Sequence, residues 1–181
     1  MTEHIAVTSR LILRKWRQRD VRRLHALCID HRVMEFLGPP QTEPEIRDVV
    51  ARQSKHQEDY GHCFWAIELR TTRTMIGFCG LQFGPIGTPI GGVPEIGWRL
   101  AYDHWGNGYA REAAQATLDW GFANLTDDTI WAITVPANIR SWGLMERLGM
   151  MRQIDMDFDH PNVPDDSPLK RHITYNIMRP Q

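Results

Sequence analysis

The stretch YDHWGNGYAREAA, residues 102–114, places two glycines around one asparagine directly before a run of helix-forming residues. The first turn of a helix has backbone amides without a partner inside the helix, and these amides and the helix dipole favour a bound anion. Gly106 and Gly108 permit positive φ angles and a close approach of the backbone to such an anion. The pattern fits a pyrophosphate site, and it fits equally a glycine-rich turn that binds nothing.

Two familiar phosphate-binding motifs do not match this turn. The Walker motif needs a lysine and a serine or threonine after its last glycine, whereas Tyr109, Ala110 and Arg111 follow Gly108. The dinucleotide motif Gly-x-Gly-x-x-Gly needs a small third residue for packing of the helix on the strand, and Arg111 occupies that place. The sequence therefore predicts a phosphate turn of another kind.

Length and composition indicate one domain, residues 1–181, with enough apolar residues for a sizeable core: the chain has 181 residues and is 42% hydrophobic. The net charge of −1 argues against a broad nucleic-acid surface. Cys28, Cys63 and Cys79 have no Cys-x-x-Cys spacing, which indicates neither a disulfide framework nor a zinc site and favours a reducing cytoplasm. The first residues do not resemble a signal peptide, and no apolar run is long enough to span a membrane.

Hydrophobic periodicity predicts an α/β chain with a mixed sheet, without the regular alternation of a doubly wound fold. Thr42 and Glu45 match a capping box at the start of a helix. Asp20 and Asn138 are the expected N-caps of two others, and Gly149 is the expected C-cap of the last. The predicted strands are residues 10–16, 63–69, 74–83, 95–102, 129–135, 151–158 and 172–178, and the predicted helices are residues 20–30, 43 to the fifties, 109–125 and 138–149.

Residues 95–114, EIGWRLAYDHWGNGYAREAA, resemble the central acetyl-CoA motif of the GNAT N-acetyltransferases. The Trp-Gly-x-Gly-Tyr-Ala form is similar to the branch that contains bacterial ribosomal-protein N-terminal (alanine) acetyltransferases. In the superfamily motif Gln/Arg-x-x-Gly-x-Gly/Ala, Gly108 and Ala110 match, and Trp105 replaces the first residue, as is usual in this branch. Segments 9–16, 33–45, 75–81, 138–150 and 157–177 resemble the branch in the same order, so the resemblance covers nearly the whole chain.

The resemblance implies the GNAT fold: a central mixed seven-stranded sheet, flanked by about four helices and splayed between the fourth and fifth strands. It implies acetyl-CoA as cosubstrate, lying between residues 95–102 and 129–135. The resemblance implies that the backbone of residues 100–102 pairs with the pantetheine arm of acetyl-CoA as it would with an additional strand. The implied cofactor-binding residues are Leu100, Ala101 and Tyr102 for the pantetheine arm, Gly106, Asn107, Gly108, Tyr109, Ala110 and Arg111 for the pyrophosphate, and Asn138 and Ser141 from the next helix.

The expected reaction is direct attack of a neutral amine on the thioester, which needs a base, an oxyanion donor and a proton for the leaving thiolate. A backbone amide near Leu100 is the candidate oxyanion donor. Many superfamily members have a tyrosine seven positions after the asparagine, but Met145 stands there and cannot give a proton. Ser141, one helical turn earlier, is the candidate acid, with packing beside the cofactor as the alternative. Glu95, where the branch usually has glutamate, is the candidate base, with an ion pair to Arg99 as the alternative.

Three hypotheses for the activity remain open. The first is acetylation of the α-amino group of a protein or peptide, because such a group, with a pKa near ~8, is about a tenth neutral at pH 7. The second is acetylation of a small amine: an amino acid, a polyamine or an antibiotic. The third is a CoA-binding module without catalysis, which the loss of tyrosine at Met145 suggests.

The acceptor pocket is expected in loops, where specificity tends to vary: residues 36–40, 84–94 and 159–168. Acidic residues between 155 and 166 would suit a polyamine, although a solvated acidic loop explains them as well. No metal is expected, because no His-x-x-x-His pair or His–carboxylate cluster is present in the sequence. No nucleic-acid or membrane partner is expected, and the resemblance allows a monomer or a homodimer.

Overall fold

The computed structural model describes residues 4–180. In this part of the chain nine strands form one mixed sheet in the order β1-β2-β3-β4-β5-β6-β9-β7, with β8 paired to β9. The strands are β1 (His4–Val7), β2 (Leu11–Arg14), β3 (Phe64–Leu69), β4 (Met75–Phe83), β5 (Pro94–Leu100), β6 (Thr129–Thr134), β7 (Met151–Arg152), β8 (Phe158–Asp159) and β9 (Arg171–Met178). The helices are α1 (Asp20–Cys28), α2 (His31–Met34), α3 (Glu43–Tyr60), α4 (Tyr109–Asn124) and α5 (Ile139–Arg147).

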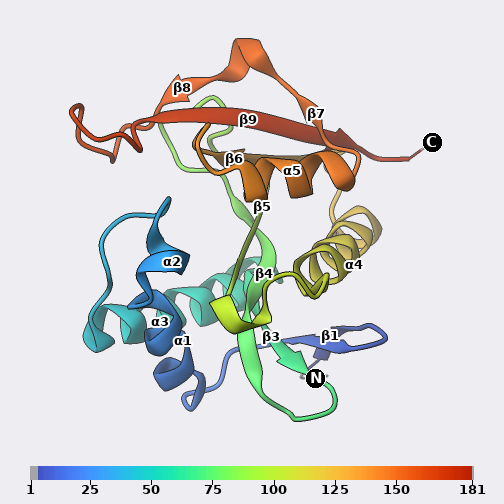
Figure 1. The fold of residues 1–181 in the computed structure, drawn as a ribbon. Helices are drawn as coiled ribbons and strands as arrows, with labels where there is room; N and C mark the ends of the chain where they lie inside the picture. The colour runs from blue at the N-terminus through green and yellow to red at the C-terminus, as the bar shows by residue number, and fades with distance from the viewer. Residues whose placement is uncertain (1–3, 181) are drawn as a thin grey trace.

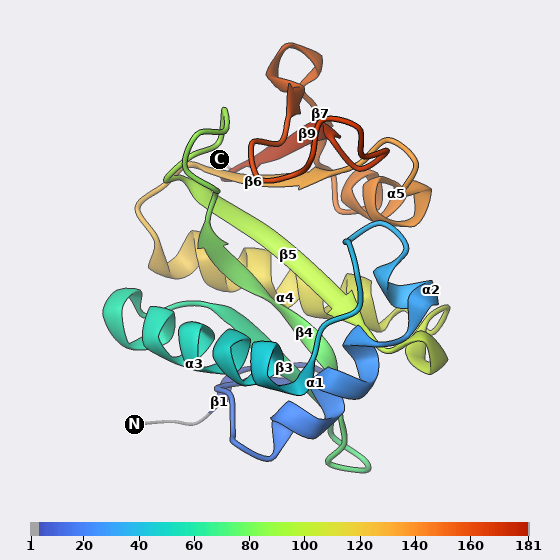
Figure 2. The same ribbon diagram turned by 90° about the vertical axis from the view of Figure 1, so that its left-hand side faces the viewer.

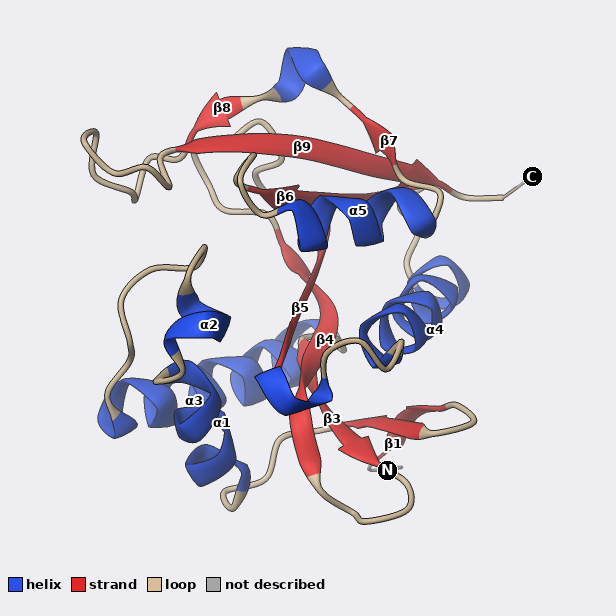
Figure 3. Cartoon of the chain, viewed as in Figure 1, coloured by secondary structure: helices blue, strands red, loops and turns tan. Residues whose placement is uncertain are grey.

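The helices cover the two faces of the sheet unequally. Helices α1, α2 and α3 gather on one face of β3, β4 and β5, and α4 lies across the opposite face (Figure 1). The view turned by 90° shows the same arrangement, with α1 to α3 in front of these strands and α4 behind them (Figure 2). Helix α5 packs beside β6 in the half of the molecule that also holds β9 (Figure 3). The mixed α/β architecture expected from the sequence is therefore confirmed.

Two local differences raise the number of strands in the described residues above the seven that the sequence predicts. Strand β1 pairs with β2 in a hairpin, although its four residues are half-buried or exposed and carry little periodic signal. The predicted strand 151–158 is wrong as one element, because a 3₁₀ turn at Ile154–Met156 divides it into β7 and β8. Both pieces still pair with β9. The short helix α2 is likewise an addition to the four predicted helices.

The sheet opens between β5 and β6. These neighbours run parallel, yet Glu95 and Trp131 are their one registered pair. All seven residues of β5 pair with β4 on the other side. Beyond Glu95 the two parallel strands therefore diverge, and one edge of β5 is left without a strand partner. This is the predicted splay between the fourth and fifth predicted strands.

Capping residues set several helix boundaries. The capping box of Thr42 and Glu45 is present, and α3 begins directly after Thr42. Asn138 caps α5 through its side chain, as expected, and Gly149 takes φ +83° just after that helix. The prediction for Asp20 is wrong: Arg19 is the N-cap of α1, because the Asp20 carboxylate is committed to an ion pair with Arg14.

That ion pair belongs to a network buried between β2, β3 and α1. The Arg14 side chain is 1% exposed, and its guanidinium lies 2.7 Å from a carboxylate oxygen of Asp20 and 2.7 Å from one of Glu68. Its remaining N–H groups reach the second Asp20 oxygen and the Lys15 carbonyl. Arg73 approaches the other Glu68 oxygen at 3.0 Å. Every charge in the network has an opposite charge beside it, which is the condition for burying ions at tolerable cost.

Candidate active site

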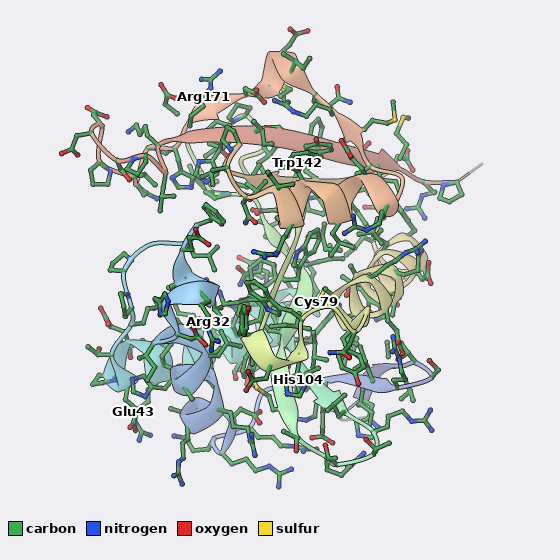
Figure 4. The ribbon with its side chains drawn as sticks, viewed as in Figure 1. Arg32, Glu43, Cys79, His104, Trp142 and Arg171 are labelled. Carbon is green, nitrogen blue, oxygen red and sulfur yellow. The ribbon has the colours of Figure 1, made fainter. Side chains whose placement is uncertain are left out.

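The splay between β5 and β6 opens into a cleft of about 1120 Å³. Its walls come from α2, β3 to β6, the turn before α4, and α5. Figure 4 labels three of the lining residues: Arg32 on α2, His104 in the turn and Trp142 on α5. The predicted site residues that line this cleft are Glu95, Leu100, Gly106, Gly108, Tyr109, Ala110, Arg111, Asn138 and Ser141. The predicted site residues Ala101, Tyr102 and Asn107 are not among its lining residues.

The glycine turn presents unbonded amides to the cleft. Gly106 and Gly108 have φ angles of +75° and +77°, and Gly108 is the N-cap of α4. The first hydrogen bond of the helix runs from the Glu112 amide to the Gly108 carbonyl. Within residues 4–180, the backbone amides of residues 106–111 have no hydrogen-bond partner. The turn therefore has the free donors and the helix dipole that favour an anion.

A contact from the N-terminus of the chain fixes this helix end. The Glu112 carboxylate accepts hydrogen bonds from the hydroxyls of Thr8 and Ser9 and from the Arg10 amide, and it pairs with the Arg10 guanidinium at 2.6 Å. Arg10 also donates to the Asn107 carbonyl. Partial burial opposes ionisation of Glu112, but these donors outweigh it and hold its pKa below the usual range. Sequence reasoning missed the contact, since its partners are about a hundred residues apart.

The free edge of β5 carries the next set of donors. The Ala101 amide donates to the Ile76 carbonyl in β4. Backbone groups alternate between the two sides of an antiparallel strand, so the amide of Leu100 points the other way, toward the cleft. The Leu100 carbonyl accepts the indole N–H of Trp105 at 2.8 Å, and the Ala101 carbonyl accepts the His104 amide. Of the three residues expected to pair with a pantetheine arm, Leu100 thus offers its amide, whereas both backbone groups of Ala101 are already bonded.

Helix α5 brings Asn138, Ser141 and Met145 to the opposite wall. The Asn138 side chain accepts from the Ser141 amide at 3.3 Å and donates to the Thr134 hydroxyl at 3.2 Å, so the capping role is confirmed. The Ser141 hydroxyl has no hydrogen bond within residues 4–180 and lies in the cleft wall. Met145 is buried and lines the same wall one turn later.

Glu95 lies where β5 and β6 begin to diverge. Its half-buried carboxyl makes no hydrogen bond or ion pair within the described residues, and burial raises its pKa to about 8. The alternative of an ion pair with Arg99 is not realised in this structure. Arg99 instead donates to the sulfur atoms of Cys28 and Met34, at 3.2 and 3.6 Å. Glu95 can thus exchange a proton with a ligand in the cleft near neutral pH.

The part of the cleft on the face of the sheet that α1 and α2 cover has an aromatic floor. The rings of Phe64 and Phe78 stack at 5.7 Å. Gly97 makes this possible, because a Cβ atom there would lie 2.8 Å from the Phe64 ring. Of the three loops expected to form the acceptor pocket, residues 36–40 contribute Phe36 and Leu37 to the lining of the cleft. Residues 84–94 and 159–168 contribute no lining residue, so the expectation for these two loops is not met.

Comparison with known proteins identifies the family. Residues 10–151 match the family model described as an acetyltransferase (GNAT) domain. A curated relative named uncharacterized N-acetyltransferase YnaD, from Bacillus subtilis (strain 168), is 31% identical over 81% of this chain and 82% of its own length. The chain belongs to the GNAT acetyltransferase family. It is therefore an acetyltransferase, and the expected GNAT fold is confirmed.

Two solved structures extend the comparison of the fold. An acetyltransferase from Salmonella typhimurium that modifies the N-terminal serine of ribosomal protein L7/L12 superposes with a TM-score of 0.79 at 17% identity, covering 97% of this chain and 99% of that one. Spermidine N-acetyltransferase from Vibrio cholerae, in complex with CoA and spermine, gives a TM-score of 0.73 at 20% identity, covering 95% and 97%. One fold thus serves a protein acceptor in one relative and a polyamine in the other, and does not by itself choose the acceptor.

The remaining expectations concern metals, cysteines and membranes. In residues 4–180 no three His, Cys, Asp or Glu side chains are grouped as a metal site. Cys28, Cys63 and Cys79 are free and buried. No helix in the described residues has the length and apolar character needed to cross a membrane.

Proposed function

We propose that this GNAT acetyltransferase uses acetyl-CoA to acetylate a primary amine by direct attack, and that the amine is the α-amino group of a protein or peptide. One observation carries the proposal: the free amides of residues 106–111 open on the same cleft as the unpaired carboxyl of Glu95. An anion-binding helix end and a titratable group near neutral pH are what an acyl-CoA substrate and a protonated amine require.

In this proposal the pyrophosphate of acetyl-CoA binds the amides of residues 106–111, with Arg111 beside it. The pantetheine arm lies along the free edge of β5, between Leu100 and Asn138. Its thioester carbonyl accepts the Leu100 amide, which stabilises the oxyanion as it forms. The Trp105 indole donates to the Leu100 carbonyl and so holds the end of β5 beside the turn that binds the pyrophosphate.

Glu95 takes a proton from the ammonium form of the acceptor, directly or through water. The neutral amine then attacks the thioester carbon, the C–S bond breaks, the nitrogen of the new amide releases one proton, and the leaving thiolate takes one, so the proton count is unchanged. Ser141 is the proposed donor of that proton, or a contact of the cofactor sulfur, because Met145 cannot serve. The carboxyl of Glu95, with a pKa of about 8, matches an α-amino group more closely than a lysine near ~10.4.

A small amine is the second candidate acceptor, and the stacked rings of Phe64 and Phe78 are the observation that favours it. A flat aromatic floor would hold a compact apolar amine. We further propose that the enzyme works in the cytoplasm, which suits three free cysteines, as a monomer or homodimer without a metal.

The test is transfer of isotope-labelled acetyl from acetyl-CoA into a cell extract that is then divided into protein and small-molecule fractions. Label in protein that maps to an N-terminus supports the proposal and names the substrate. Label confined to the small-molecule fraction would show that the acceptor is a small amine and not a protein or peptide. Binding of acetyl-CoA without transfer to either fraction would contradict the proposed reaction.

A further inference from the structure

Arg99 carries a charge in the wall of the cleft, and no carboxylate within residues 4–180 forms an ion pair with it. Its guanidinium lies over the Phe78 ring, 5.3 Å from the centroid, between β5 and the helices α1 and α2. One of its terminal nitrogens donates hydrogen bonds to the sulfur atoms of Cys28 and Met34. The Nε atom is buried and has no hydrogen-bond partner within residues 4–180. Sulfur is a weak acceptor, so this cation is poorly satisfied by the protein alone.

The charged and titratable groups around Arg99 do not supply a counter-charge. Glu95 shares its strand face but is four residues away, roughly 13 Å along an extended strand, and forms no ion pair with it. Asp30 pairs with Arg32 at 2.6 Å instead. Burial raises the pKa of the Cys28 thiol despite the nearby guanidinium, so this thiol is neutral at physiological pH.

Buried charges in proteins are normally paired, because an unpaired ion loses its hydration without compensation. The same chain follows this rule at Arg14, whose guanidinium contacts two carboxylates. Arg99 is half-buried in the wall of the cleft, its buried Nε atom has no hydrogen-bond partner, and no carboxylate pairs with it within residues 4–180. A guanidinium presents its donors in a planar fork that matches a carboxylate.

We propose that Arg99 binds a carboxylate of the acceptor, so that the enzyme acetylates amines that also carry an acidic group. The inference rests on the proposed function and narrows its substrate class. Along β5, Glu95 lies two residues before Gly97, which is packed against the Phe64 ring, and Arg99 lies over the Phe78 ring. The acceptor is then an amine near Glu95, an apolar body over the rings, and a carboxylate near Arg99. A peptide with an acidic side chain near its N-terminus meets this description, whereas a free α-amino acid, whose amine and carboxylate share one carbon, and a polyamine do not.

The experiment measures binding of acetylated products to the CoA complex by calorimetry, which does not depend on turnover. The probes are N-acetylphenylalanine, its uncharged amide, and the amide of N-acetylphenylalanylglutamate, whose one carboxylate is on a side chain. We expect the amide of N-acetylphenylalanylglutamate to bind about ten- to a hundred-fold more tightly than the uncharged amide. N-acetylphenylalanine, whose carboxylate is on the same carbon as the acetylated nitrogen, should show little of this preference.

In Arg99→Met the preference should disappear while affinity for CoA is unchanged. Arg99→Lys keeps the positive charge but loses the planar pair of donors, so it should retain part of the preference for the carboxylate probe. This variant provides the test if Arg99→Met does not fold. Arg32→Met is the matched control: it removes another cation of the cleft, one already paired with Asp30, and should leave the carboxylate preference in place.

Equal binding of the charged and uncharged probes to the unmodified enzyme would overturn the inference, as would a preference that survives in Arg99→Met. Weaker binding of CoA itself in that variant would also overturn it, by assigning Arg99 to the cosubstrate. A failure of the proposed function would look different: no labelled acetyl would reach any amine, whatever the result of the binding measurements.

Discussion

Arg14 and Arg99 lie on the same sheet, and each has nitrogen atoms buried in the protein, but their surroundings differ. Arg14 lies between β2, β3 and α1, with Asp20 and Glu68 against its guanidinium. Arg99 lies in the cleft with two neutral sulfurs and a phenyl ring. The first is a closed ion network, whereas the second is half-buried in the wall of the cleft and has no ion-pair partner within residues 4–180.

The two carboxyl groups Glu112 and Glu95 repeat this contrast. Glu112 accepts hydrogen bonds from several donors, which lower its pKa, whereas Glu95 has none and burial raises its pKa to about 8. Paired charges hold segments together: Glu112 ties the first residues of the chain to α4. Unpaired charges cost stability and are retained where chemistry uses them. The difference between the two regions is therefore a difference between structural and functional use of charge.

The largest expected effect comes from applying one substitution to both arginines. Arg14→Met should cost about 3–5 kcal/mol of the free energy of unfolding, because it leaves Asp20 and Glu68 buried without their main counter-charge. Arg99→Met should change that free energy by less than about 1 kcal/mol, since no ion pair is lost. Denaturant titration of both variants measures this, and equal losses would break the distinction between the two regions.

Glu95→Gln tests the same contrast by its effect on kcat rather than on stability. The amide keeps the shape of the side chain but cannot take a proton, so kcat should fall by about a hundred-fold with an α-amino acceptor. Stability should be unchanged at acidic pH. Steady-state kinetics with an amine identified by the labelling experiment measures this. A kcat within about threefold of the unmodified enzyme would show that Glu95 is dispensable.

Gly108→Asp tests whether the glycine turn is part of the functional region. A negative charge at this helix end should raise the dissociation constant of acetyl-CoA by about thirty-fold or more, through repulsion of the pyrophosphate. Gly61→Asp is the matched control, because Gly61 also has a positive φ, +80°, and does not line the cleft. Unchanged affinity in Gly108→Asp, measured by calorimetry, would show that the pyrophosphate binds elsewhere.

Ser141→Ala should lower kcat about tenfold if the hydroxyl protonates the leaving thiolate, with little change in stability. A loss confined to the KM for acetyl-CoA would assign Ser141 to cofactor contact. Parallel rate measurements at several acetyl-CoA concentrations separate the two results.

A dependence of stability on pH should come from Glu95. Its pKa is about 8 in the folded protein, against an ordinary value of 4.5. Between these values the folded state keeps a proton that the unfolded chain has lost, so this group makes stability fall as pH rises toward 8. The Tm of the unmodified protein should decline relative to that of Glu95→Gln over this range. Parallel curves for the two proteins would contradict the raised pKa.

Much of the scaffold follows from local pattern. The capping box at Thr42, the cap at Asn138 and the glycines of the turn determine backbone geometry within a few residues, and the structure has each of them as expected. The expected strand over residues 151–158 is interrupted because Arg152 pairs with Asp157 and the Thr174 hydroxyl donates to the Met156 carbonyl. The pattern of apolar residues along the sequence gives no sign of these contacts, so the interruption could not be predicted from it.

The sequence by itself determined the family resemblance, the glycine turn before α4 and most helices and strands, because these depend on residues close together in the chain. Tertiary structure decided which charged side chains have an ion-pair partner and which do not. Asp20 looked like a helix cap and became a partner of Arg14, while Arg99 looked like a partner of Glu95 and instead faces Cys28 and Met34. The physical reason is that the state of a charge depends on what lies within a few ångströms of it, and folding brings those neighbours from distant parts of the chain.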